Sequence, residues 1–127
     1  LKNGVVYIAP GGKHMRVVKK GTDYCIKLSD EPAIDGLRPC ANVMYESLEN
    51  CQYDEITCVV LTGMGADGTK GIQGLAAHHK KLHVIAQDAD TCVVYGMPKA
   101  IAQTGLVDEV VPLGSVAETI TKNVGVS

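Results

Sequence analysis

A run of mainly apolar residues, followed at once by a glycine-rich loop and a helix-like repeat, constrains this chain more than any other feature. Residues 56–62 form the strand-like run, and residues 63–68 read GMGADG. Ile72, Leu75 and Ala76 then recur at the spacing of one helix face. Strand, tight turn and helix in this order are typical of α/β proteins, in which helices connect parallel strands.

The rest of the chain extends this pattern. Residues 5–9 and 83–86 are apolar runs that predict buried strands, and residues 107–112 are a shorter β-prone segment. Residues 15–20 and 24–28 flank a turn and predict an antiparallel hairpin. Strands without apolar–polar alternation are typical of parallel sheets covered on both faces. We therefore predict a three-layer, doubly wound α/β fold with a mainly parallel sheet and one antiparallel hairpin.

Helices are predicted between these strands. One begins near Pro39, one follows the glycine-rich loop, one is broken near Pro98, and the last opens at a capping-box pattern formed by Ser115 and Glu118. Loops after parallel strands meet at one edge of the sheet. We therefore expect three loops to gather there and to place three side chains at one crevice, namely His14, Asp67 and Asp88.

Composition excludes several classes of function. The chain has 127 residues, enough for one domain, and a formal charge of −2 with both signs scattered, which offers no basic face for nucleic acid or an anionic membrane. No apolar run reaches the roughly 20 residues that span a bilayer. The five cysteines include no C-x-x-C pair and the four histidines show no metal-ligand spacing. We predict a cytoplasmic protein with free thiols, no metal and no cofactor.

The glycine-rich loop leaves two interpretations open. Gly63, Gly65 and Gly68 match the G-x-G-x-x-G dinucleotide fingerprint, and Asp88 follows at about the 20-residue distance at which that fingerprint has an acid. Asp67, however, places a carboxylate where a pyrophosphate would have to approach. Nucleotide binding through this loop is therefore the alternative function.

Asp67 itself has two compatible roles. Asp is a favoured N-cap, and Asp67 stands just before a helix predicted from Thr69. A helix N-terminus also favours an ionised carboxylate, which is able to hold an imidazole in one tautomer as in a Ser-His-Asp triad. The backbone N–H groups of the same turn are suited to stabilising an oxyanion.

Four segments resemble those of a known family. VVYIAPGGKHM (5–15), LTGMGADG (61–68), IAQD (85–88) and CVVYGMP (92–98) are similar, in this order, to segments of the CheB-type chemotaxis protein-glutamate methylesterases. The resemblance covers nearly the whole chain. It implies that residues 1–127 are the C-terminal portion of a methylesterase catalytic domain whose N-terminal part is missing.

The resemblance implies that the protein is a serine hydrolase that takes part in signal transduction. The complete enzyme would demethylate glutamate γ-methyl esters, and deamidate glutamines, on the cytoplasmic helices of bacterial chemoreceptors, and family members usually carry an N-terminal receiver domain. Asp67 matches the triad acid, Met64 and Gly65 match the oxyanion loop, and His14 matches a histidine that shapes the cleft. A simple hydrogen-bonded loop histidine is the alternative for His14.

The departures from the family also matter. Its nucleophilic serine and its base precede the part that this chain resembles, and none of Ser29, Ser47, Ser115 or Ser127 lies in a glycine-rich strand-to-helix turn. We therefore expect the chain alone to be inactive. A third interpretation is that it is a fragment without enzymatic activity, which only folds or contributes a docking surface to a receptor or regulatory partner.

Residues 37–43 read LRPCANV where the family has HRPSVDV, so that a thiol and an amide replace a hydroxyl and an acid. A nucleophilic Cys40 and a buried, structural Cys40 are both open. A doubly wound sheet without its leading strands exposes an edge, and we expect such a fragment to be less stable than the whole domain or to associate.

Overall fold

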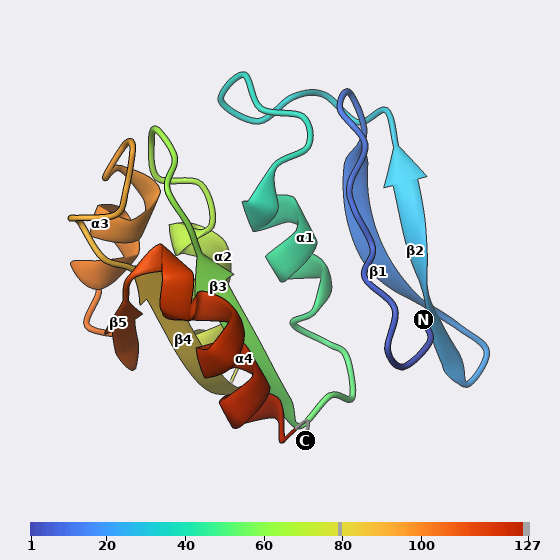
Figure 1. Cartoon of the computed structure of the whole chain (residues 1–127). Coiled ribbons are helices and arrows are strands. Elements are labelled where there is room, and N and C mark those ends of the chain that lie inside the picture. The colour runs from blue at the N-terminus through green and yellow to red at the C-terminus, as the bar shows by residue number, and fades with distance from the viewer. Residues whose placement is uncertain (79, 126–127) are drawn as a thin grey trace.

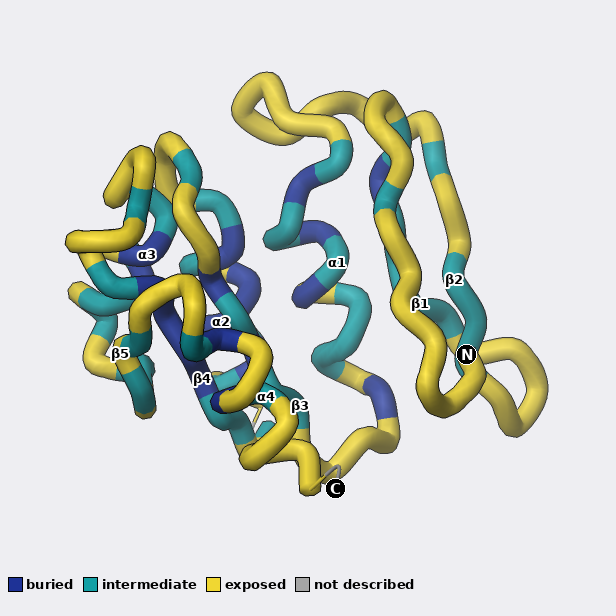
Figure 2. Tube along the Cα trace, in the orientation of Figure 1, coloured by how far each residue is buried: buried dark blue, intermediate teal, exposed yellow. Residues whose placement is uncertain are grey.

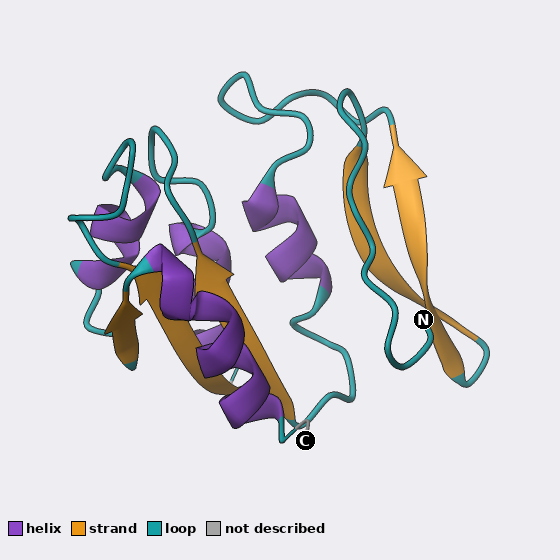
Figure 3. Ribbon diagram, in the orientation of Figure 1, coloured by secondary structure: helices purple, strands orange, loops and turns teal. Residues whose placement is uncertain are grey.

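The computed structural model describes residues 1–78 and 80–125 of the chain. Strands and helices alternate after an N-terminal hairpin (Figures 1 and 3). The elements are β1 (His14–Lys20), β2 (Asp23–Ser29), α1 (Ala41–Ser47), β3 (Glu55–Val60), α2 (Thr69–Ala77), β4 (Lys81–Gln87), α3 (Met97–Ala102), β5 (Glu109–Val111), a 3₁₀ turn (Leu113–Ser115) and α4 (Val116–Val124).

The main sheet has the strand order β3-β4-β5 and is parallel throughout. Helix α2 connects β3 to β4 and α3 connects β4 to β5, as the strand, loop and helix pattern predicts. The core that α1, α2 and α3 share with β3 and β4 lies on one face of the sheet, and α4 packs against the other (Figure 1). The predicted three-layer α/β class is therefore confirmed, with the hairpin as a separate two-stranded sheet.

The core lies between the sheet and the helices of the first face. Cys58 and Val60 on β3, with Val84 and Ala86 on β4, point toward α2 and α3. Ile72, Leu75 and Ile101 meet them from those helices and are fully buried. In Figure 2 these buried segments run along β3, β4 and the inner side of α1 and α2. No helix in the described ranges is both long and apolar enough to cross a membrane.

The hairpin packs on α1 rather than on the main sheet. β1 and β2 pair in antiparallel register from His14 opposite Ser29 to Lys20 opposite Asp23, as predicted. The backbone N–H of Val17 donates to Ser47 Oγ of α1 at 2.9 Å, which links the two elements. Helix α1 thus lies between the hairpin and α2.

The buried strand predicted at residues 5–9 is wrong. The segment is extended but belongs to no strand, and Val6 and Ile8 are each 85% exposed. It runs beside the hairpin as an exposed trace (Figure 2). A β-branched run shows that side chains fit a pleated surface, whereas a strand also needs a backbone partner. The segment has no such partner among the described residues.

Two local predictions also differ from the structure. Residues 88–96 are not helical, and α3 begins at Met97 with Pro98 in its first turn, where no N–H is needed. Ser115 stands at the N-cap of α4, but its side chain makes no cap hydrogen bond. The 3₁₀ turn that precedes α4 gives Ser115 a helical ψ of −2°, and a capping side chain needs an extended residue.

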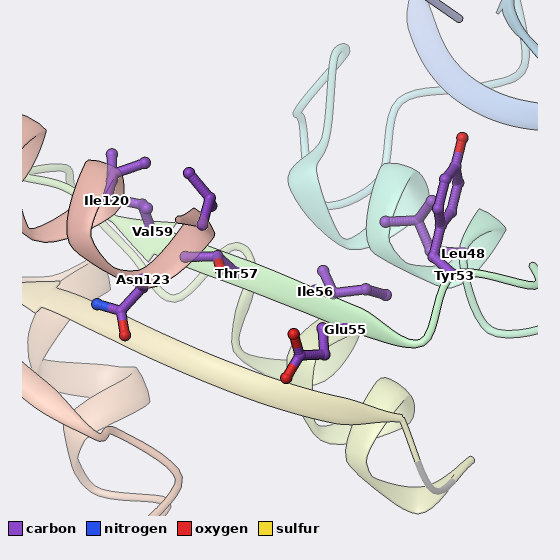
Figure 4. A pocket seen from close by; sticks show the side chains of 9 residues that line it. Leu48, Tyr53, Glu55, Ile56, Thr57, Val59, Ile120 and Asn123 are labelled. Carbon is purple, nitrogen blue, oxygen red and sulfur yellow. The ribbon is translucent and has the colours of Figure 1, made fainter. Parts of the chain in front are cut away.

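The edge of the sheet at β3 is open. β3 pairs with β4 on one side and has no further partner in the described part of the chain. A cavity of about 520 Å³ lies along this edge. Figure 4 shows that α4, with Ile120, borders the cavity on one side of β3, while Leu48 and Tyr53 border it near the end of α1.

Candidate functional site

The carboxylate of Asp67 lies against the first turn of α1. Asp67 Oδ2 accepts from the backbone N–H of Ala41 at 2.7 Å, and Oδ1 accepts from the N–H of Asn42 at 3.0 Å. The Cys40 thiol donates to the same Oδ1 at 3.1 Å. Three donors therefore fix both oxygens of one half-buried carboxylate.

Asn42, on α1, in turn accepts hydrogen bonds from the first turn of α2. Its Oδ1 accepts from the backbone N–H of Gly68 at 2.9 Å and from that of Gly71 at 2.8 Å. Gly68 is the N-cap of α2 and has no side chain to cap it, so Asn42 supplies the missing acceptor. The predicted role of Asp67 as the N-cap of the Thr69 helix is wrong, because Asp67 caps α1 instead.

These contacts argue against the nucleotide alternative. A pyrophosphate at the glycine-rich loop needs the free N–H groups of the following helix. The N–H groups of Gly68 and Gly71 donate to Asn42, and that of Thr69 donates to the carbonyl of Ala66. Since these N–H groups at the start of α2 already have acceptors within the chain, the helix start offers a phosphate little to bind.

The 63–68 loop is held by the segment that precedes α3. The carbonyl of Gly63 accepts from Met97 N–H at 2.8 Å, and a Cβ at Gly63 would lie 2.5 Å from the Met97 sulfur. Gly65 has a φ of +87°, which glycine adopts without strain. Met64 is 85% exposed. Neither Met64 N–H nor Gly65 N–H donates to another group in the described residues.

Three of the four predicted site residues share one cavity. Met64, Gly65 and Asp67 line a space of about 560 Å³ between the 34–37 loop and the starts of α1 and α2. A second cavity, of about 300 Å³ and with mostly apolar walls, lies on the other side of Cys40 and is lined by Ala9, Met15, Met44 and Asp67. Asp67 therefore lies between two cavities.

Among the described residues, no hydrogen bond or shared cavity links His14 or Asp88 to Asp67. Neither residue lines either of the two cavities beside Asp67. His14 is fully buried at the start of β1, where Nε2–H donates to the Pro32 carbonyl at 2.9 Å. Asp88 accepts from the N–H and hydroxyl of Thr91 and so closes its own loop. The geometry of His14 fits the alternative of a hydrogen-bonded histidine.

Within residues 1–78 and 80–125, the serines and Cys40 show no nucleophilic arrangement. Ser29 donates to Glu31 and Ser47 to the Met44 carbonyl, while Ser127 lies outside the described residues. Cys40 is 3% exposed, and burial, followed by the hydrogen bond to Asp67, raises the pKa of its thiol. A neutral, buried thiol is a poor nucleophile, so the structural interpretation of Cys40 is the one that the geometry favours.

The partners of Asp67 were not predicted. Cys40 and Asn42 stand out in the sequence only as departures from the family pattern in residues 37–43. These departures draw attention to the segment but do not indicate which residues lie next to it in the fold. Only the packing of α1 on α2 brings it to residues that lie 25 to 29 positions later in the chain.

Comparison with known proteins gives a consistent result. The family model described as CheB methylesterase matches residues 1–120. A protein-glutamate methylesterase/protein-glutamine glutaminase of Desulfotalea psychrophila is 43% identical over 126 residues, which are 98% of this chain and 34% of that protein. A protein of the same name from Lawsonia intracellularis is 44% identical over 120 residues, 94% of this chain and 33% of that protein.

A solved structure agrees with these relatives. The crystal structure of the Thermotoga maritima CheB methylesterase catalytic domain superimposes with a TM-score of 0.83 at 33% identity. The match covers 91% of this chain and 60% of that domain. The chain thus spans about a third of the length of the two curated relatives named above. With a family model over residues 1–120 and a shared fold, the chain belongs to the CheB methylesterase family.

Proposed function

We propose that the complete protein hydrolyses glutamate γ-methyl esters on bacterial chemoreceptors, and deamidates receptor glutamines, with Asp67 as the acid of a Ser-His-Asp triad. The names of the relatives support this substrate class. The observation that carries the proposal is the Asp67 carboxylate, which three donors hold in one orientation beside a cavity.

The hydrogen bonds of Asp67 leave room for an imidazole. A carboxylate has about four lone-pair positions. Oδ1 accepts two hydrogen bonds and Oδ2 accepts one, so Oδ2 has one position left. The mainly apolar cavity of about 300 Å³ beside Asp67 provides space for a histidine ring from another part of the protein. An N–H of that ring would donate to Oδ2 and would be fixed in one tautomer.

The 63–68 loop supplies the second element of such a site. Met64 N–H and Gly65 N–H have no acceptor in the described chain, and both residues line the cavity of about 560 Å³ that Asp67 also lines. N–H groups that are fixed before the reaction stabilise the negative oxygen that forms when a nucleophile adds to an ester carbonyl. In this proposal the nucleophilic serine and the base histidine are supplied from outside this chain.

The test is methanol release from a methylated receptor. The protein expressed from its complete reading frame is compared with its Asp67→Asn variant, and the 127-residue chain is assayed beside them. Loss of the orienting acid from an intact triad lowers turnover by about 10⁴-fold. We expect the complete protein to be active, the variant to lose activity on this scale, and the short chain to be inactive.

A matched control separates the role of Asp67 from a general effect of removing a carboxylate. Asp54 lies in an exposed loop before β3, and Asp54→Asn is expected to leave methanol release unchanged. Full activity of Asp67→Asn would contradict the assignment of the acid. An active short chain would contradict the statement that nucleophile and base come from elsewhere.

A further inference from the structure

Of the three groups that donate hydrogen bonds to Asp67, two are backbone N–H groups and one is a side chain. The N–H groups of Ala41 and Asn42 are the first of α1 and belong to the backbone, so every residue type except proline supplies them at these positions. The third donor is the Cys40 thiol, 3.1 Å from Oδ1. Cys40 is the N-cap residue of α1, yet its side chain does not cap that helix and points to Asp67 instead.

The surroundings of Cys40 keep its thiol in the form that donates. The side chain is 3% exposed, and burial and the neighbouring carboxylate both raise the pKa of the thiol. A thiol that keeps its proton contributes an S–H donor to the carboxylate and does not compete with it as an anion. Cys40, like Asp67, lines both of the cavities of about 560 and 300 Å³.

We propose that Cys40 is a positioning residue of the hydrolytic site, which acts through Asp67 by fixing the orientation of its carboxylate. The inference rests on the proposed function. With only the two backbone donors, one to each oxygen, the carboxylate would still be able to rotate by small angles about its Cβ–Cγ bond. The Cys40 thiol, a third donor that binds Oδ1, restricts this rotation and so keeps the unused lone pair of Oδ2 in a constant direction.

The test is a double-mutant cycle in the complete protein, with methanol release as the readout. Wild type, Cys40→Ala, Asp67→Asn and the double variant are compared. We expect Cys40→Ala to lower kcat about tenfold, as loss of one hydrogen bond to a charged group does, and to leave KM unchanged. In the Asp67→Asn background, Cys40→Ala is expected to cause no further loss, because the group through which Cys40 acts is already changed.

Two further variants distinguish positioning from a general effect on packing. Cys40→Ser keeps a donor at the same place and is expected to restore kcat to within about twofold of wild type. Cys51→Ala removes another buried thiol, 6% exposed and outside both cavities, and is expected to leave kcat unchanged. Wild-type kcat in Cys40→Ala, or additive losses in the double variant, would overturn the inference. A complete wild-type protein without methanol release would instead overturn the proposed function, and this inference with it.

Discussion

Asn42 and Asp67 cap each other's helices. Asp67 accepts the first two N–H groups of α1, the helix that carries Asn42, and Asn42 accepts two N–H groups at the start of α2, the helix that follows Asp67. Neither α1 nor α2 has a cap hydrogen bond from the side chain of its own N-cap residue. The orientation of the proposed catalytic acid is therefore tied to the packing of the two helices.

Asn42→Ala is expected to destabilise the fold. The change leaves the N–H groups of Gly68 and Gly71 without their acceptor in a partly buried position. An unsatisfied donor of this kind costs about 1–3 kcal/mol in free energy of unfolding. Urea unfolding at neutral pH measures this loss. Asn50→Ala, at an exposed position after α1, is the control and is expected to stay within about 0.5 kcal/mol of wild type. Equal stability of the two variants would contradict the cross-capping argument.

Gly71→Ala is expected to separate α1 from α2. A Cβ at Gly71 would lie 2.6 Å from Tyr45 Cβ and 3.1 Å from Asn42 Cα, atoms that cannot move without moving α1. Overpacking of this kind costs about 1–3 kcal/mol. Gly74→Ala, in the same helix, would meet only the flexible end of Glu49, and the higher helix propensity of Ala offsets that contact. Thermal unfolding of both variants checks this, and a more stable Gly71→Ala would refute it.

The sequence was sufficient to predict the alternation of β3, α2 and β4, because an apolar run, a glycine-rich turn and a 3.6-residue period are local signals. The same kind of signal failed at residues 5–9. That run has the composition of a buried strand, yet Val6 and Ile8 are exposed, since pairing depends on a partner elsewhere in the fold. Periodicity therefore predicted elements correctly only where their partners are also present in the described chain.

At the candidate site, sequence reasoning selected Asp67 but assigned its hydrogen bonds to the wrong helix. An Asp just before a helix is a favoured cap of that helix, and nothing local indicates that another helix lies closer. The N–H groups that Asp67 binds belong to residues 41 and 42, and their approach depends on how α1 packs on α2. Residue type was thus predictable, whereas the partners depend on tertiary packing.

Stability is expected to fall at alkaline pH, in part through Cys58. Burial raises the pKa of the Cys58 thiol to about 11, from an ordinary value of 9.0. Between these values the unfolded chain has lost this proton while the folded chain keeps it, so the free energy of unfolding decreases as pH rises through this window. Burial also raises the pKa of Tyr45, which acts in the same direction. Cys58→Ala lowers stability at pH 7 but is expected to make the decline above pH 9 less steep. Denaturant titrations at a series of pH values measure the free energy of unfolding. The same slope of this free energy against pH in Cys58→Ala and wild type would contradict the expectation.

The open edge of β3 is expected to make the 127-residue chain associate with itself. β3 has no second neighbour in the described residues, and an apolar cavity lies along it. Unpaired strand edges bind other edges, and natural proteins often block them with lysine. Thr57 lines this cavity on β3, so Thr57→Lys is expected to increase the monomer fraction in sedimentation experiments. Thr22→Lys, at the exposed hairpin turn, adds the same charge away from the edge and is expected to associate like wild type. A wild-type chain that stays monomeric at high concentration would show that the edge is protected, and equal effects of both variants would mean that net charge, not the β3 edge, governs association.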